Sequence, residues 1–196
     1  MSAYVELRAH TCFSFSDGAV SAEALAKHAR ERGYTHLGIT DTADLGGMAR
    51  FGVEAMSPLK DPLCPNAERH GDEYCRTCQY PVRPIAGAEL NVDGRPAAFL
   101  ARHGDGYRNL AALVTLARVG QWQEWDKKVQ GKRRGRPKIT WAHVAQHSAG
   151  LHAMTGPASG ELASLIRAGK ESEDKRCLSR WREIFAPGTL SIEVQL

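Results

Sequence analysis

The sequence predicts an α/β fold in which short strands and helices alternate along a single domain spanning residues 1–196. Three observations support this expectation. Stretches with an apolar residue at every second position, such as YVELRAH, alternate with stretches of helical spacing, such as SAEALAKHAR. Hydrophobic residues make up 42% of the chain, which is enough for one core of ordinary size. No internal repeat is visible, so one domain remains the expectation.

The first predicted element is a strand with a polar face. Residues 4–10 alternate between apolar and polar side chains, so Glu6, Arg8 and His10 point to the same side. The strand runs into a loop that contains Asp17, which is followed by glycine. A strand that delivers a histidine and an aspartate to one loop is typical of a metal-binding phosphoesterase, but Arg8 interrupts that pattern.

A helix and a second strand complete a βαβ unit. Ser21 is placed to cap a helix whose apolar residues recur at helical spacing, and Gly33 is placed to end it. The stretch THLGIT then predicts a strand that ends at Asp41. Because parallel strands of this kind collect functional residues at their carboxyl ends, Asp41 is a candidate site residue.

The alternation continues to the C-terminus. A short helix is expected after Thr140, which is placed to cap it. The other predicted strands are RPIAGAEL, PAAFLAR, LHAMTG and TLSIEVQL, and the other predicted helices are YRNLAALVTLAR, residues 159–168 and CLSRWREIF. The last strand has no covering helix after it, so we expect a fold that is truncated at its C-terminus.

Composition indicates the compartment. The N-terminus lacks the layout of a signal peptide, and no run of about 18 apolar residues is present, so we expect a cytoplasmic protein without a membrane partner. The five cysteines are an odd number, which favours reduced thiols or metal ligands over a disulfide framework.

Several blocks in order resemble one known family. These blocks are YVELRAHTCFSFSDG, THLGITDTADLGGMARF, PIAGAEL, FLARHGDGYRNLAALVTLAR, LHAMTGPASGEL and LSIEVQL. They resemble the PHP (polymerase and histidinol phosphatase) domain at the N-terminus of bacterial C-family DNA polymerases, the polymerase III alpha subunit and its error-prone relatives. The resemblance implies a distorted, TIM-like barrel of seven β/α units with two or three metal ions at the carboxyl ends of its strands. It further implies phosphoester hydrolysis in active members.

The resemblance also implies a ligand set, which this chain keeps only in part. The positions that retain a ligand type are His10, Asp17, Asp41 and Glu89, and the positions that do not are Arg8, Thr42, Pro96 and Pro157. The last family ligands would lie after Leu196. Arginine has only hydrogen-bond donors and stays protonated, so Arg8 cannot ligate a metal. We therefore expect divalent metals (Zn²⁺ or Mn²⁺) to bind this remnant site weakly or not at all.

Arg8 suggests a more specific hypothesis. Buried carboxylates repel one another unless a positive charge lies among them, so Arg8 could be a substitute cation for the lost metals, beside Asp17, Asp41 and Glu89. The alternative is that Arg8 only pairs with Glu6 on the same strand face.

Two polar segments interrupt the fold pattern. Residues 57–83 form a predicted inserted loop in which Cys64, His70, Cys75 and Cys78 have the spacing C-x5-H-x4-C-x2-C, and this set favours a closed structural Zn²⁺ site. The alternative is an exposed loop with incidental cysteines.

The second interruption is basic. The chain has 26 Lys and Arg residues against 22 Asp and Glu residues, and residues 127–138 hold seven of the bases and no acid. These bases are Lys127, Lys128, Lys132, Arg133, Arg134, Arg136 and Lys138. They predict a loop that contacts the phosphates of DNA, with Trp122, Trp125 and Trp141 near enough in sequence to stack on bases. The alternative is a solvated loop with tryptophans packed in the core.

The sequence thus predicts the partial PHP domain of a polymerase used in DNA replication or in translesion synthesis and repair. Its phosphoesterase centre would be degraded, its role mainly structural and close to DNA, and its partners the rest of the polymerase chain, DNA and other replisome subunits. No catalytic residue is expected, because the nucleotidyl-transfer carboxylates would lie in a palm region outside this chain. The alternatives are a working metal-dependent phosphoesterase or 3'–5' exonuclease, and a zinc-stabilised nucleic-acid-binding module.

Overall fold

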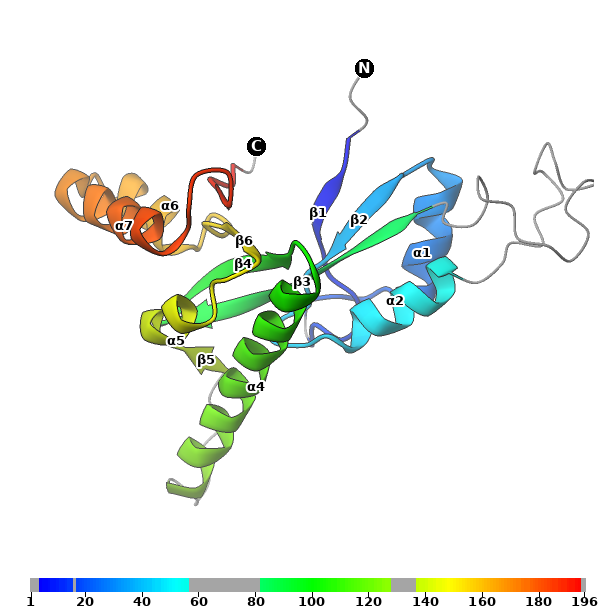
Figure 1. Ribbon diagram of the computed structural model, residues 1–196, viewed down its shortest axis with the longest axis horizontal. Helices are drawn as coiled ribbons and strands as arrows, with labels where there is room; N and C mark the ends of the chain where they lie inside the picture. Colours follow the sequence, from blue (N-terminus) through cyan, green and yellow to red (C-terminus); the bar gives the residue numbers. More distant parts are fainter. Residues whose placement is uncertain (1–3, 16, 57–81, 128–136, 195–196) are drawn as a thin grey trace, which may run out of the picture.

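The computed structural model describes residues 4–15, 17–56, 82–127 and 137–194 (Figure 1). In these ranges a seven-stranded sheet has the order β1-β2-β3-β4-β6-β7, and β5 pairs with β3 beside this path. The strands are β1 (Glu6–Ala9), β2 (His36–Ile39), β3 (Arg83–Val92), β4 (Arg95–Ala101), β5 (Lys138–Ile139), β6 (Leu151–Met154) and β7 (Leu190–Ser191).

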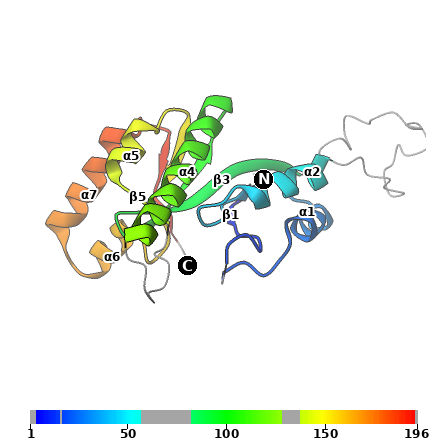
Figure 2. The ribbon, with the colours of Figure 1, turned by 90° about the horizontal axis from the view of Figure 1, so that it is seen from below.

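The sheet is mixed and curled. β1, β2 and β3 are parallel neighbours, whereas β3, β4 and β6 are antiparallel neighbours. β3 is long enough to belong to both parts, and Figure 2 shows it running from one part of the molecule to the other. The α/β class is therefore confirmed. The seven repeating β/α units remain a prediction, because an antiparallel hairpin stands where two successive parallel units would be expected.

The helices are α1 (Ala22–Glu31), α2 (Gly46–Met56), α4 (Gly104–Lys127), α5 (Trp141–Gln146), α6 (Glu161–Arg167) and α7 (Glu171–Ile184). Two predicted caps are present: the Ser21 side chain accepts a hydrogen bond from Ala24 N–H, and Thr140 forms a capping box with His143. Gly33 follows α1 with a φ of 73°, a conformation that favours glycine.

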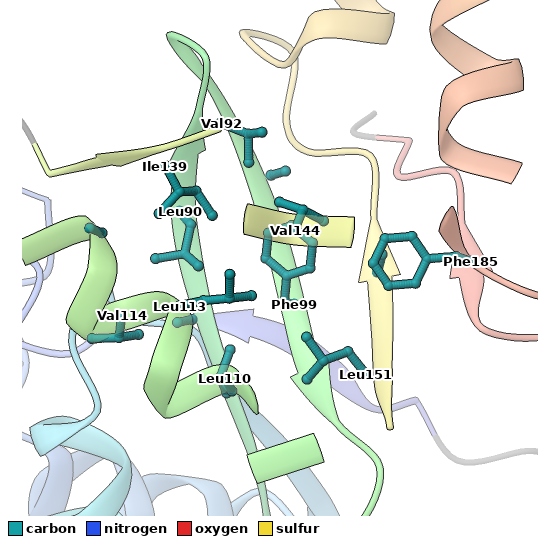
Figure 3. Packing of buried hydrophobic residues seen from close by; sticks show 14 of the residues in the cluster. Leu90, Val92, Phe99, Leu110, Leu113, Val114, Ile139, Val144, Leu151 and Phe185 are labelled. Atoms are coloured by element: carbon teal, nitrogen blue, oxygen red, sulfur yellow. The ribbon is translucent and has the colours of Figure 1, made fainter. Parts of the chain in front are cut away.

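Each part of the sheet has its own core. α1 and α2 cover the parallel part and bury Ala26, Ile39 and Phe51. α4, α5 and α7 cover the antiparallel part, where the cluster in Figure 3 includes Phe99 and Leu113. Complete burial of one such large side chain stabilises the fold by about 1.5–3 kcal/mol.

Two predicted boundaries differ from the structure. α2 was not predicted, and its first residues, Gly46 and Gly47, are poor helix formers. The basic segment is not wholly a loop, since Lys127 is the last residue of α4 and Lys138 lies in β5. The predicted zinc ligands Cys64, His70, Cys75 and Cys78 lie outside the described residues.

Other bases of the basic segment also fall outside the description, namely Lys128, Lys132, Arg133, Arg134 and Arg136. Among the described residues, no helix combines the length and the hydropathy needed to cross a membrane.

Candidate functional site

A pocket of about 670 Å³ opens between β1 and the residues that follow β7. Titratable side chains from distant parts of the sequence line it, namely Glu6, Arg8, His10, Asp17, Glu89 and Glu193. β1 contributes Arg8, and His10 follows directly after it, because alternate residues of an extended chain face the same side. The polar face predicted for residues 4–10 is therefore the wall of this pocket.

Arg8 lies between two carboxylates. One terminal nitrogen donates to Glu89, and Nη1 donates to Glu193 Oε1 at 2.6 Å. The Arg8 side chain is only 13% exposed, so both ion pairs are partly shielded from water. Glu6 accepts the backbone N–H of Arg8 at 2.7 Å, not its guanidinium.

Glu89 is a carboxylate in an unfavourable place. Burial raises the pKa of Glu89 above its usual value, and the nearby Arg8 and His10 oppose that rise without cancelling it. Asp17 and Glu193 raise the same pKa further through their negative charge. Glu89 and the four charged or titratable groups that act on its pKa are therefore close in space. The sequence separates two of these groups, Arg8 and Glu193, by 185 positions.

His10 and Asp17 form a second pair within the pocket. His10 Nδ1 hydrogen bonds to Asp17 Oδ2, and the Asp17 side chain is 62% exposed whereas that of His10 is mostly buried. The other ring nitrogen of His10, Nε2, is buried and has no hydrogen-bond partner among the described residues. The histidine and the aspartate that the sequence places around this loop, His10 and Asp17, are therefore in contact.

Asp41 belongs to a different network, which we call the Asp41 knot (Thr11, Ser14 and Asp41). Asp41 is completely buried, and its carboxylate accepts hydrogen bonds from Thr11 N–H, Thr11 Oγ1 and Ser14 Oγ, each at 2.7 Å. Ser14 Oγ in turn accepts the backbone N–H of Thr42 at 3.0 Å. The knot therefore fastens the loop after β1 to the end of β2.

Two glycines allow the knot to pack closely. A Cβ atom on Gly47 would lie 2.0 Å from Asp41 Oδ2, and a Cβ atom on Gly18 would lie 1.8 Å from the carbonyl oxygen of Thr11. Both distances are far shorter than a van der Waals contact. The glycine of the predicted Asp-Gly turn is thus required by close approach of the backbone, independently of any metal.

The structure also shows where the remaining positions lie at which the resemblance implies a metal ligand but this chain has none. Thr42 forms an isolated bridge with Glu89, Pro96 lies in β4 opposite Asn91, and Pro157 lines the pocket. Across residues 4–15, 17–56, 82–127 and 137–194, no group of three His, Cys, Asp or Glu side chains is arranged to hold a metal ion. Asp41 in particular directs its oxygens at Thr11 and Ser14.

The basic segment meets the fold away from this pocket. Lys138 pairs in register with Asn91, beside a second pocket of about 370 Å³. Trp141 lines the second pocket, where its ring contacts Trp181 at a centroid distance of 4.6 Å and the Arg180 guanidinium at 4.3 Å. Trp141 therefore packs against the core, whereas the side chains of Trp122 and Trp125 lie outside the described part of the structure.

Three residues of the site were not singled out from the sequence: Glu193, Thr11 and Ser14. Glu193 lies between the apolar residues Ile192 and Val194 in the predicted strand TLSIEVQL. Such alternation is only a weak indication that a side chain faces a pocket. Thr11 and Ser14 precede an Asp-Gly turn, and small hydroxyl residues in such loops often hydrogen bond to a nearby carboxylate. No pattern in the sequence joins them to Asp41, 30 and 27 positions away.

Comparison with known proteins agrees with the arrangement of the blocks. The profile of the PHP domain matches residues 6–196. DNA polymerase III subunit alpha of Pseudomonas aeruginosa is 28% identical over 192 residues, which cover 98% of this chain and 14% of that protein. Error-prone DNA polymerase of Mycobacterium tuberculosis is 28% identical over 204 residues, which cover 98% of this chain and 16% of that protein. Error-prone DNA polymerase of Anaeromyxobacter is 32% identical over 170 residues, which cover 84% of this chain and 13% of that protein.

One solved structure comes from Bifidobacterium adolescentis and is a protein whose role as a metal-dependent phosphoesterase is itself only proposed. It is 14% identical, with a TM-score of 0.37, and the match covers 94% of this chain and 56% of the other. The chain spans 14% to 16% of the length of the first two polymerases. Because the family profile matches almost the whole sequence, the chain belongs to the PHP domain family.

Proposed function

We propose that this chain is the PHP portion of a bacterial DNA polymerase of the polymerase III alpha or error-prone type, with a degraded phosphoesterase site and a mainly structural role. One observation carries the proposal. The guanidinium of Arg8, which the resemblance places at a family ligand position, pairs with Glu89 and Glu193 inside the pocket. A positive side chain that already neutralises the carboxylates leaves no role for a metal ion at that point.

The Asp41 knot supports the same proposal. A multinuclear metal centre needs several carboxylate and imidazole groups with free lone pairs directed at one point. Asp41 accepts three hydrogen bonds from Thr11 and Ser14 instead. In the part of the chain that the structure describes, these residues do not fit a centre of two or three metals, so the proposed structural role includes no metal-dependent step.

Arg8 takes the role of substitute cation in this proposal. The positive charge of Arg8 offsets the repulsion between Glu89 and Glu193, which burial would otherwise make costly. The domain then keeps its fold and its pocket without hydrolysing phosphoesters. In the longer polymerases its task would be to pack against the rest of the chain and to lie near DNA in the cytoplasm.

Metal analysis and an activity assay test the proposal together. The 196-residue chain is assayed for hydrolysis of bis(4-nitrophenyl) phosphate in added Mn²⁺, and its bound metals are measured by mass spectrometry. We expect no turnover above the protein-free blank, for the chain and for Glu89→Gln alike. Turnover that disappears in Glu89→Gln would refute the structural role and establish the hydrolase.

One observation favours that second candidate, a working phosphoesterase that uses a single metal. The buried Nε2 atom of His10 has no hydrogen-bond partner among the described residues, and an imidazole nitrogen is a good metal ligand. The metal measurement separates the two metal predictions. Metal that persists in Cys75→Ser/Cys78→Ser and disappears in His10→Ala would lie in the pocket. Metal with the opposite response would be the structural zinc of residues 57–83.

The basic segment carries the proposed contact with DNA, and salt dependence tests it. Affinity for single-stranded DNA is measured by fluorescence anisotropy at several salt concentrations for Lys132→Ala/Arg133→Ala. If both side chains neutralise phosphates, the slope of log affinity against log salt becomes shallower by about 1.4. Lys175→Ala/Arg176→Ala, on the exposed face of α7, is the charge-matched control. Equal slopes for the two variants would discard the assignment.

A further inference from the structure

β1 and β7 stand at opposite ends of the strand order, and no backbone pairing joins them in the described sheet. Residues of β1 and the residues that follow β7 nevertheless line the same 670 Å³ pocket, since Arg8 lies on β1 and Glu193 lies two residues after β7. Figure 1 shows the C-terminal segment approaching the side of the sheet where β1 lies. Something other than strand pairing must therefore bring these edges together.

A short parallel ladder holds the last segment against β6. β7 contains two residues, and Thr189 and Ser191 accept N–H groups from Ala153 and Thr155 at 2.8 and 3.1 Å. Beyond them, the Glu193 N–H donates to Thr155 Oγ1 at 3.2 Å. We call residues 188–194 the strap. So short a ladder makes the strap a candidate for local opening, in which one part of a protein separates while the rest stays folded.

Arg8 supplies a contact between the strap and the far edge of the sheet. Its Nη1 atom donates to Glu193 Oε1 at 2.6 Å, and both side chains are 13% exposed. A charge-assisted hydrogen bond shielded from water is stronger than one on the surface. If the strap opened, Glu89 would keep its partner, whereas the contact with Glu193 would be lost.

We propose that Arg8 and Glu193 form a clasp that holds the strap against the far edge of the sheet and so keeps the pocket closed on that side. The clasp is a conformational device, and it goes beyond the structural role proposed for the domain. Arg8 has two partners with separate tasks: Glu89 fixes the arginine on the sheet, and Glu193 is the group that the arginine holds. Release of the strap would remove one wall of the pocket without disturbing α1, α2 or the Asp41 knot.

Hydrogen exchange measured by NMR on the 196-residue chain tests the clasp. In Glu193→Gln, which keeps the side-chain shape and removes the charge, we expect the amides of Ala153, Thr155 and Glu193 to exchange at least about tenfold faster. The amide of Thr40, which donates to Ala9 in the parallel part, should keep its rate. The matched control is Glu89→Gln, which removes the charge of the other partner of Arg8, keeps an oxygen that can accept from the guanidinium, and removes no contact with the strap.

Three outcomes would overturn the clasp. They are unchanged exchange at the strap amides, an equal acceleration at Thr40, and an equal effect of Glu89→Gln on the strap. Arg8→Met should accelerate the same amides, and Arg8→Met/Glu193→Gln should exceed neither single variant by much, because the two residues share one interaction. If Arg8→Met does not fold, Glu193→Gln and its control still decide the result. None of these measurements depends on metal content or hydrolysis, so they are independent of the proposed function.

Discussion

Asp41 lies two residues after β2 and Glu89 lies on the neighbouring strand β3, yet the fold accommodates the two carboxylates in opposite ways. Asp41 is satisfied by N–H and O–H donors that are close in space and come from one loop. Glu89 is satisfied by the charge of Arg8, which also serves Glu193. The difference shows two ways in which a fold can accommodate a shielded carboxylate. Neutral hydrogen-bond donors can surround it, as at Asp41, or a cationic side chain of the same chain can pair with it, as at Glu89.

The two arrangements also differ in what they connect. The Asp41 knot joins a loop to the next strand within the parallel part, over about thirty positions of sequence. The contacts of Arg8 span 81 positions to Glu89 and 185 positions to Glu193. Local contacts form at a smaller cost in chain entropy than distant ones. We therefore expect the knot to be the more stable of the two and the contacts of Arg8 the more easily opened.

Removing the knot should have the largest effect on stability. Asp41→Ala leaves the Thr11 N–H and the Ser14 hydroxyl buried without their acceptor, so we expect the free energy of unfolding to fall by about 3–5 kcal/mol. Urea unfolding followed by circular dichroism measures this loss. Asp41→Asn, which keeps one oxygen acceptor, should lose less. A loss below about 1 kcal/mol for Asp41→Ala would show that water replaces the missing acceptor.

Removing the guanidinium of Arg8 should have the second largest effect on stability. Arg8→Met keeps much of the apolar stem and leaves Glu89 and Glu193 facing each other, and we expect a loss of about 2–3 kcal/mol near neutral pH. The loss is smaller than for Asp41→Ala because Glu89, whose pKa burial already raises, can take up a proton. It should therefore shrink as the pH is lowered toward 5, in the same unfolding experiment. A loss that does not change with pH would contradict repulsion between the carboxylates as its cause.

Removing Glu89 should have a much smaller effect than removing its partner. Burial raises the pKa of Glu89 despite the nearby Arg8, so the carboxylate gains less from the pairing than it loses in hydration. For Glu89→Gln we expect a change below about 1 kcal/mol in either direction near neutral pH, because Glu193 still pairs with Arg8. A loss as large as that of Arg8→Met would mean that the ion pair outweighs burial.

The sequence predicted the elements better than their assembly. Ser21 and Thr140 were recognisable as caps because capping depends on residues three positions away. The antiparallel pairing of β3 with β4 was not foreseen, although the turn between them contains Asp93 and Gly94, both with positive φ. Glu193 could not be assigned to the pocket, because its partner lies at the other end of the chain and no local pattern records such a contact.

The smallest predicted effect concerns His152, which adds a second and neutral attachment of the strap. His152 Nε2 lies 2.9 Å from Ser191 Oγ, and burial together with the charge of Arg102 lowers the pKa of His152 below its usual value of about 6.5. A histidine whose pKa is lowered in the folded state binds fewer protons there than in the unfolded chain. Its contribution to stability is therefore complete above about pH 6.5 and is lost as the pH falls through the folded-state value.

Unfolding midpoints in urea between pH 5 and pH 7.5 measure this contribution. The contribution of His152 is the difference between the profiles of the chain and of His152→Gln, so we expect the stability of the chain relative to this variant to rise slightly with pH. The slope should be small because the ring is only partly buried. Combining His152→Gln with Glu193→Gln shows whether the two side-chain contacts of the strap depend on each other. If His152 and the Arg8 clasp act cooperatively on the strap, His152→Gln should accelerate exchange at Thr155 by a larger factor in Glu193→Gln than in the unchanged chain. If the two contacts act independently, the factor should be the same in both.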